Sequence, residues 1–296
     1  LDKRFHAGLA KNADSIEAAL KQLSAGAGQA RVLAGGQSLG PMLNMRLATP
    51  SEVIDLNDLT ELAYIREAGD FLEVGALTRH DQVARSPLVW RECALLAQAA
   101  RTIGHYAIRQ RGTLGGSLAN ADPAAQLPLV AVTLRASIEV ISMRGERSIP
   151  AADFFLSAMT TALAPDEIIR CVRFPKTTGE GSAFQMFNRR HGDFAIVTAA
   201  VSLAMEGDRI ARLRLGVGGA QAVPWQADDL LHDVIGQRAV ADWAAVVGQR
   251  VAAALAPDDD ARIPAQYRKE LACTLVRQAL ERSCMNTMKA TDKEAI

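Results

Sequence analysis

Two pairs of adjacent glycines, Gly35-Gly36 and Gly115-Gly116, stand in the first half of this chain. A glycine has no Cβ atom, so paired glycines mark places where the backbone turns sharply or where another group comes close to it. In the first segment, LAGGQSLGP (33–41), a predicted buried strand runs into the glycines, and polar residues follow. Backbone N–H groups that converge in such a turn bind phosphate oxygens, although an isolated pair of glycines is more often a simple tight turn.

The second segment, RGTLGGSLANADPAAQLP (111–128), holds few large side chains. Its Asp122-Pro123 pair predicts a helix start, because Asp is a good N-cap and proline suits the first helical position. The N-terminus of a helix also attracts anions. Neither segment matches the G-x-x-x-x-G-K-[ST] or the G-x-G-x-x-G fingerprint, so a nucleotide bound here would lie outside a P-loop or a Rossmann turn.

The composition indicates a globular protein of two or three domains, since the chain has 296 residues, 49% of them hydrophobic and 22% charged. Lys+Arg and Asp+Glu both number 33, so the net charge gives no general reason to expect nucleic-acid binding. No apolar run reaches about eighteen residues, and no membrane span is predicted. The cysteines are too scattered for a disulfide framework or a metal site and indicate a reducing cytoplasm: Cys93, Cys171, Cys273 and Cys284.

The N-terminal part mixes helix and strand patterns. Helical periodicity predicts helices at 15–23 and 89–104, the second of them Ala-rich and apolar. Two alternating runs around Gly69-Asp70 predict a β-hairpin. Thr78 followed by Asp81 resembles a capping box and predicts the start of a short helix.

The polar, glycine-rich segment KTTGEGS (176–182) predicts a domain boundary, which divides the chain into 1–176 and 177–296. Beyond it, a long alternating pattern predicts an antiparallel hairpin that turns at Gly207-Asp208. Two long helices are predicted at 239–255 and 265–284. The fold class predicted for the whole chain is α+β, with a small sheet and packed helices in the C-terminal part.

Three segments in this order, LAGGQSLGPMLNMR, AIRQRGTLGGSLANADPAAQLP and FNRRHGDFAIVTAAVSL, closely resemble the FAD-binding medium subunit of the molybdenum hydroxylases. That family includes xanthine dehydrogenase, carbon monoxide dehydrogenase and the bacterial N-heteroaromatic dehydrogenases. The resemblance covers nearly the whole chain. It implies a two-subdomain FAD-binding domain of the vanillyl-alcohol-oxidase type, with subdomains at about 1–57 and 58–176, followed by a small C-terminal α+β domain.

The resemblance also implies which residues contact FAD. The first glycine segment surrounds the diphosphate and ribityl chain in the family, which carries over to Leu33, Ala34, Gly35, Gly36, Gln37, Ser38, Leu39 and Gly40. The second glycine segment covers the diphosphate from the other side, which carries over to Thr113, Leu114, Gly115, Gly116 and Ser117. Ile103 and Phe194 fall where the family places side chains beside the flavin, and Ile169 matches a backbone contact. For residues of these types, a place in an ordinary hydrophobic core is the commoner role.

Three positions depart from the family pattern. Gln126 stands where the family usually has an acid that helps to hold the cofactor, and Asn120 replaces a frequent histidine. Gln185 stands near the expected adenine or flavin edge, where relatives that use NAD have a lysine. A neutral amide keeps the hydrogen bonding of Gln126 but loses the charge, and Gln185 makes NAD a less expected acceptor.

By this resemblance, the chain is an oxidoreductase subunit that carries FAD and no catalytic acid or base of its own. Its partners would be a small subunit with iron–sulfur clusters and a large subunit with the molybdopterin cofactor, and the complex would be a dimer of heterotrimers. Electrons would pass from the clusters to FAD and then to an external acceptor. The expected substrate is an N-heteroaromatic compound of the nicotine or quinoline type.

Other functions stay open at this point. The complex could be a carbon monoxide dehydrogenase or a purine or aldehyde dehydrogenase. The chain could also be a stand-alone FAD oxidase, although its C-terminal part is small for a substrate pocket. A non-enzymatic binding module is the third alternative. Neither a Ser-His-Asp arrangement nor a pair of carboxylates points to hydrolysis.

Overall fold

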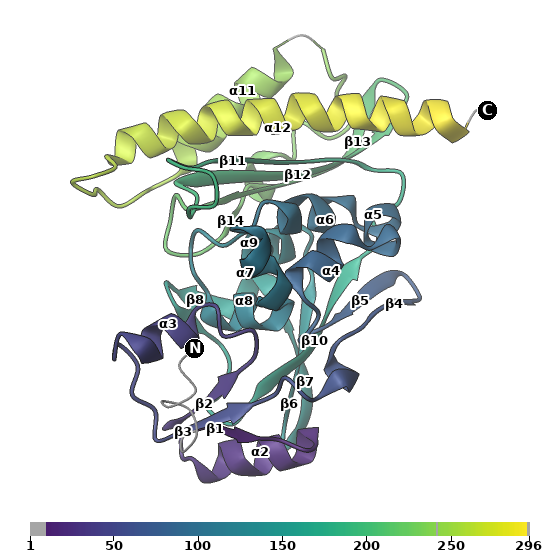
Figure 1. The fold of residues 1–296 in the computed structure, drawn as a ribbon. Helices are drawn as coiled ribbons and strands as arrows, with labels where there is room; N and C mark the ends of the chain where they lie inside the picture. Colours follow the sequence, from purple (N-terminus) through teal and green to yellow (C-terminus); the bar gives the residue numbers. More distant parts are fainter. Residues whose placement is uncertain (1–9, 241, 295–296) are drawn as a thin grey trace.

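The computed structural model of the chain describes residues 10–240 and 242–294 and stacks its three larger sheets along its long axis, with a fourth sheet of only two strands (Figure 1). The N-terminal sheet is parallel, with the strand order β1-β3-β2. Its elements are β1 (Ala10–Asn12), α2 (Ile16–Ala25), β2 (Ala30–Leu33), α3 (Leu39–Asn44) and β3 (Glu52–Asp55). Parallel neighbours need crossover connections, and here α2 and α3 supply them. The helix predicted at 15–23 is confirmed as α2.

The Ser15 hydroxyl caps α2 by accepting a hydrogen bond from the Ala18 N–H group at 3.1 Å. A Ser15→Ala variant is expected to lose about 1 kcal/mol of unfolding free energy, because that N–H group then has no partner in the helix. Chemical denaturation of the purified chain measures this loss. Ser15→Thr keeps the hydroxyl and is expected to match the wild type, so an equal loss in both variants would contradict the capping role.

The middle sheet has five strands in the order β4-β5-β10-β6-β7, and every neighbouring pair is antiparallel. The strands are β4 (Ile65–Ala68), β5 (Phe71–Gly75), β6 (Ser137–Ser142), β7 (Gly145–Pro150) and β10 (Ile168–Pro175). The hairpin predicted at Gly69-Asp70 is confirmed as β4–β5. Short elements connect these strands: η1 (Thr60–Leu62), α10 (Ala151–Phe154), β8 (Phe155–Ser157) and β9 (Thr160–Thr161).

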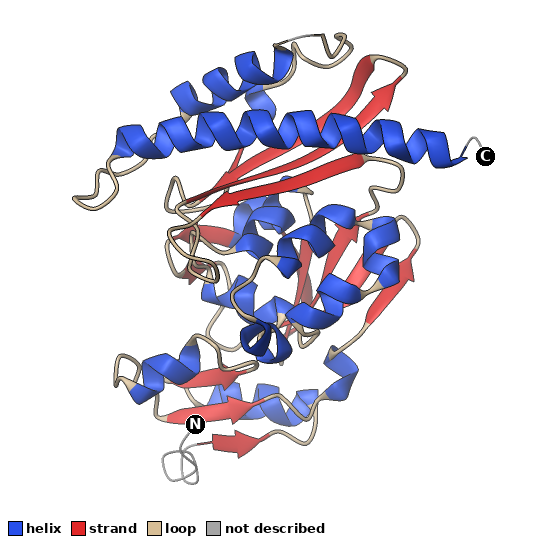
Figure 2. Cartoon of the chain, turned by 45° about the horizontal axis from the view of Figure 1, so that its top comes forward, coloured by secondary structure: helices blue, strands red, loops and turns tan. Residues whose placement is uncertain are grey.

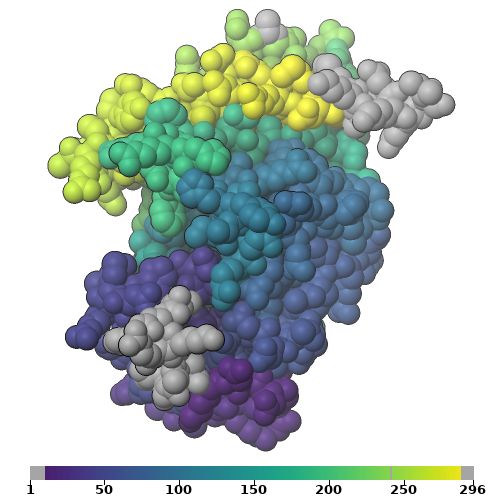
Figure 3. All heavy atoms as spheres, in the orientation of Figure 1, coloured from purple at the N-terminus to yellow at the C-terminus, as the bar shows by residue number. Residues whose placement is uncertain are grey.

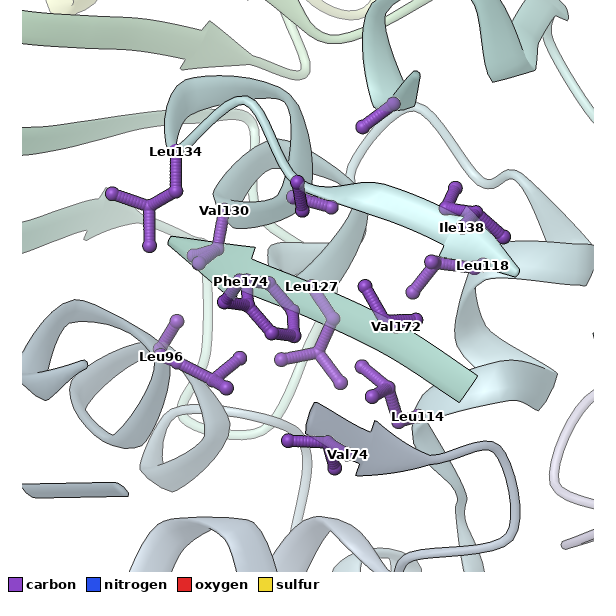
Figure 4. Close-up of a cluster of buried hydrophobic side chains, with 14 of the residues drawn as sticks. Val74, Leu96, Leu114, Leu118, Leu127, Val130, Leu134, Ile138, Val172 and Phe174 are labelled. Atoms are coloured by element: carbon purple, nitrogen blue, oxygen red, sulfur yellow. The ribbon is translucent and has the colours of Figure 1, made fainter. Parts of the chain in front are cut away.

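Helices pack against one face of the middle sheet (Figure 2). They are α4 (His80–Arg85), α5 (Pro87–Glu92), α6 (Ala94–Arg101), α7 (Tyr106–Arg111), α8 (Leu114–Asn120) and α9 (Gln126–Thr133). Leu96, Leu127 and Phe174 meet in the core between these helices and the sheet (Figure 4). All eight residues of α9 are buried, which is typical of a helix with protein on every side. Accordingly, α9 contacts both the middle core and the C-terminal sheet.

The C-terminal sheet is antiparallel, with the order β11-β12-β13-β14. Its strands and helices are β11 (Gly181–Phe187), β12 (Val197–Glu206), β13 (Arg209–Gly218), β14 (Trp225–Gln226), η2 (Asp228–Leu230), α11 (Trp243–Ala254) and α12 (Ala265–Glu294). The long helix α12 packs along β11 and β12 (Figure 1). The predicted hairpin, the two predicted helices and the predicted α+β class are confirmed.

Three local predictions were wrong. The single helix predicted at 89–104 is interrupted at Cys93, because the Glu92 carbonyl accepts a hydrogen bond from the Thr177 N–H group at 2.8 Å. The short helix α4 starts after Arg79, whose N–H group donates to the Gln82 side chain, and not through Thr78 and Asp81. Asp122-Pro123 forms a turn and the helix begins at Gln126, because the Pro123 carbonyl accepts from Gly219 of the C-terminal part.

No helix in the part of the chain that the structure describes is both long and apolar enough to span a membrane. Within residues 10–240 and 242–294, no group of three or more His, Cys, Asp or Glu side chains is placed to hold a metal ion.

Candidate functional site

The first glycine segment connects β2 to α3 and turns at Gly36, which has a φ of +68°. This left-handed conformation favours glycine, since an L side chain there is strained. The N–H groups of Gly35, Gly36, Gln37 and Ser38 donate to no other atom of the described residues. A turn that presents several backbone donors in succession is a concavity suited to anionic oxygens.

The second glycine segment is a helical turn, whereas a loop was expected. Thr113 caps α8, and its hydroxyl accepts a hydrogen bond from the Gly116 N–H group at 3.1 Å. The N–H groups of Leu114 and Gly115 donate to the carbonyls of Thr78 and Ala76. These donors are already used, so the segment is not a nest of N–H groups. Thr113, Leu114 and Gly115 are buried, and only Gly116 and Ser117 are partly exposed.

The glycines of this helix serve its packing against the end of β5. A Cβ atom built on Gly115 would lie 2.6 Å from the Ala76 Cβ and 2.9 Å from the Ala76 carbonyl oxygen. A Cβ built on Gly116 would meet the Thr113 hydroxyl at 2.8 Å, with the Ala34 Cβ at 3.9 Å. The second contact shows that the first glycine segment lies beside α8.

The two glycine segments are in direct contact. A Cβ atom built on Gly35 would lie 2.2 Å from the Arg111 carbonyl oxygen and 2.8 Å from the Gly112 Cα. Figure 3 shows the same arrangement, with the steel-blue atoms of the α7–α8 region meeting the purple-blue atoms of the N-terminal part. Segments that are far apart in the sequence therefore form one surface, which small residues keep free of bulky side chains.

His80 lies behind this contact and is only 5% exposed. Its backbone N–H group donates to the Gly112 carbonyl at 2.9 Å, and its ring Nε2 lies 2.8 Å from the Thr113 carbonyl. Burial lowers the pKa of His80 to about 4, so the ring is neutral at pH 7 and donates through Nε2. The ring supports the backbone of the second glycine segment and does not face solvent.

Positive charge surrounds the contact. Arg79, Arg109 and Arg111 have no carboxylate partner within salt-bridge distance among the described residues. Burial, and then the nearby charge of Arg111, lowers the pKa of Arg79 below its usual range. Arginines that are not neutralised by acids suit a phosphate-bearing ligand.

A third segment, which follows β11, reaches the same region. A Cβ built on Gly192 would lie 2.5 Å from the Cε1 atom of His105, and the His105 and His191 rings are 5.6 Å apart. Ile103 precedes this point, is half-buried against the middle core, and has its carbonyl held by Arg109 at 3.0 Å. Phe194 of the third segment is 70% exposed, which is unusual for so large an apolar side chain.

The remaining expected residues lie in regular elements. Ile169 is 6% exposed and belongs to the core, next to a β-bulge in β10. Gln126 is buried as the first residue of α9, and Gln185 is half-buried in β11. Arg79 and Asn57, which connect the glycine segments, were not predicted, because nothing in the sequence near them distinguishes them from surface residues.

The residues present fit the FAD expected from the sequence. The first segment has unused donors for a diphosphate, unpaired arginines lie near it, and Gly35 leaves no room for a side chain. Gly116 of the second segment lies beside the first one, with the Ala34 Cβ 3.9 Å from a Cβ atom built on it.

Comparison with known families and proteins shows the family of the chain. Residues 7–177 match the family described as "FAD binding domain in molybdopterin dehydrogenase", and residues 182–283 match the "CO dehydrogenase flavoprotein C-terminal domain". The nicotine 6-hydroxylase medium subunit of Paenarthrobacter nicotinovorans is 39% identical over 90% of this chain and 93% of its own. The carbon monoxide dehydrogenase medium chain of Afipia carboxidovorans is 33% identical over 86% and 88%.

Among solved structures, quinoline 2-oxidoreductase from Pseudomonas putida 86 has a chain with a TM-score of 0.91 and 31% identity, covering 96% of this chain and 99% of its own. The likeness extends through both the FAD-binding part and the C-terminal part. The chain belongs to the family of FAD-binding medium subunits of the molybdenum hydroxylases and is an oxidoreductase subunit.

Proposed function

We propose that this chain binds one FAD without a covalent bond where the two glycine segments meet. The observation that carries the proposal is the contact of Gly35 with the Arg111–Gly112 backbone beside four unused N–H groups. In this arrangement, residues 33–40 hold the diphosphate and ribityl chain, and Thr113–Ser117 covers them from the other side. Bound FAD accepts electrons singly or in pairs, and so joins one-electron donors to a two-electron acceptor.

The other predicted residues have supporting roles. Ile103 and Phe194 lie on segments that meet through His105, which supports a place for both beside the flavin ring. Ile169 would act through its backbone at the β-bulge, since its side chain is in the core. Gln126 and Gln185 would give neutral hydrogen bonds, and the division into 1–176 and 177–296 would separate the cofactor part from the C-terminal part.

The proposed partners are a small subunit with iron–sulfur clusters and a large subunit with the molybdopterin cofactor, assembled as a dimer of heterotrimers. The relatives named as a medium subunit or a medium chain support the presence of a small and a large partner subunit. The four cysteines are free, which supports a reducing cytoplasm as the compartment: Cys93, Cys171, Cys273 and Cys284.

The proposed substrate class is N-heteroaromatic. The relative named for nicotine is 39% identical to this chain, against 33% for the one named for carbon monoxide. Co-expression of the chain with its small and large partner subunits, followed by anaerobic addition of candidate substrates, tests the assignment. Bleaching of the flavin absorption by a nicotine- or quinoline-type compound is expected, and bleaching only by carbon monoxide, an aldehyde or a purine would contradict it.

Phe194→Ala is expected to change the flavin and not the fold. The side chain is 70% exposed, so the unfolding free energy should change by less than about 0.5 kcal/mol. The visible absorption band of the bound FAD should shift, and reduced flavin should reoxidise at a different rate. Val246→Ala, which removes an exposed apolar side chain on α11, is the control. An unchanged spectrum and rate in Phe194→Ala would remove this residue from the flavin site.

A further inference from the structure

Arg79 connects the two glycine segments by a continuous chain of hydrogen bonds. Its Nη1 donates to the Arg111 carbonyl, and its Nη2 donates to the Asn57 Oδ1 at 2.8 Å. The Asn57 Nδ2 donates in turn to the Ala34 carbonyl at 2.7 Å. This series of hydrogen bonds therefore begins at the first residue after β2 and ends just before Gly112, and both ends are backbone atoms of the glycine segments.

Both members of this chain are held in place by other contacts. The Arg79 N–H group donates to the Gln82 side chain at 2.8 Å, and the next residue, His80, donates to the Gly112 carbonyl at 2.9 Å. The Asn57 N–H group donates to the Asp55 carboxylate at 2.9 Å, at the end of β3. The link thus joins the residues that follow β3 of the N-terminal sheet to the start of α4, which follows β5 of the middle sheet.

The geometry requires arginine. Its planar guanidinium offers several donors in a fixed fork and so reaches two acceptors that lie in different directions. A lysine at this position would keep the positive charge but offers one nitrogen on a flexible stem. The two acceptors of Arg79 are a backbone carbonyl and an amide oxygen, and neither is charged. The contacts of Arg79 therefore set a position and do not neutralise a carboxylate.

We propose that Arg79 is a positioning residue for FAD, which locks the first glycine segment against the second through Asn57 and keeps the N–H groups of residues 35–38 converged. This inference rests on the proposed function. Arg79 acts through the Ala34 and Arg111 carbonyls, and the cofactor is bound by the segments that it joins. Without the link, the position of the first glycine segment relative to α8 would not be fixed.

The test measures FAD affinity of the full chain by titrating the apoprotein and following the quenching of flavin fluorescence. Arg79→Gln is expected to weaken FAD binding by about tenfold or more, and Asn57→Ala by a similar factor. The double variant should be no weaker than the worse single variant by more than about twofold, because both residues belong to one chain of bonds. Arg85→Gln removes an equal charge from the same helix and should stay within about twofold of the wild type.

Arg79→Lys separates positioning from charge. If Arg79 acts through geometry, this variant loses most of the affinity that Arg79→Gln loses. Affinity of Arg79→Lys near that of the wild type would overturn the inference, as would wild-type affinity in Arg79→Gln or independent, multiplying losses in the double variant. Should Arg79→Gln fail to fold, Arg79→Lys and Asn57→Ala carry the same test.

A second measurement follows the mobility of the first glycine segment itself. Amide hydrogen exchange in a peptide covering 33–40 should be faster in the folded Arg79→Gln apoprotein than in the wild type, while exchange in β12 stays unchanged. Equal exchange at 33–40 would also overturn the inference. Failure of the wild-type chain itself to bind FAD would instead refute the proposed function, so the two failures are distinguishable.

Discussion

Gly35→Ala is expected to weaken FAD retention by the purified chain. The new Cβ atom would lie 2.2 Å from the Arg111 carbonyl oxygen and 2.8 Å from the Gly112 Cα, and both of these are backbone atoms that cannot rotate away. The two glycine segments must then separate. Overpacking of this kind costs about 1–3 kcal/mol, and if all of it is taken from FAD binding, the affinity falls by about fivefold to over a hundredfold.

Gly207→Ala is the control for this variant. Gly207 lies in the β12–β13 turn with a φ of +61°, and a Cβ atom built there meets nothing within 4 Å. The substitution should cost about 1 kcal/mol through backbone strain and leave FAD affinity unchanged. Thermal unfolding and FAD titration of both variants separate the two effects. Full FAD retention by Gly35→Ala would show that the contact between the segments is not needed for the cofactor.

The stability of the chain is expected to fall steeply between pH 6.5 and pH 4 because of His80. Its folded-state pKa is about 4, below the ordinary value of 6.5, because burial disfavours the charged ring. The unfolded chain therefore binds a proton more readily than the folded chain in this window. Stability is fully present above pH 6.5, decreases as the pH falls to 4, and is then flat, with a total loss of about 3 kcal/mol from this residue.

The pKa of His80 is low because the ring is buried, where a second ring proton, on Nδ1, would have no hydrogen-bond acceptor. The buried Nδ1 of His80 has no hydrogen-bond partner among the described residues, and Arg79 and Arg109 add repulsion. Urea unfolding at several pH values measures the effect. His80→Gln should remove most of the slope between pH 6.5 and pH 4, whereas His232→Gln, at a largely exposed side chain, should keep it. An unchanged slope in His80→Gln would assign the pH dependence to other groups.

Elements set by local chemistry could be predicted from the sequence. The hairpins at Gly69-Asp70 and Gly207-Asp208 combine alternating strands with a turn that favours glycine, and both glycines have a positive φ. The Ser15 cap is equally local. The long C-terminal helices follow from extended helical periodicity. These features need no partner from a distant part of the chain.

Elements set by distant contacts could not be predicted. The helix predicted at 89–104 is interrupted because the Glu92 carbonyl accepts a hydrogen bond from the Thr177 N–H group. The helix expected at Pro123 begins only at Gln126, because the Pro123 carbonyl accepts a hydrogen bond from the Gly219 N–H group. In the candidate site, the small residues of both glycine segments were identified, but the direct contact between the two segments was not predicted. The link through Arg79 and Asn57 has no local signature, since its partners are backbone carbonyls far along the chain.

The most direct test of the account is the cofactor content of the native protein. The purified chain should be yellow, and denaturation should release FAD, without a covalent link, at about one molecule per chain. Gly35→Ala purified in the same way should hold less FAD than the wild type while remaining folded. A wild-type chain that is folded, colourless and unable to take up added FAD would contradict the central claim that the two glycine segments form a flavin site.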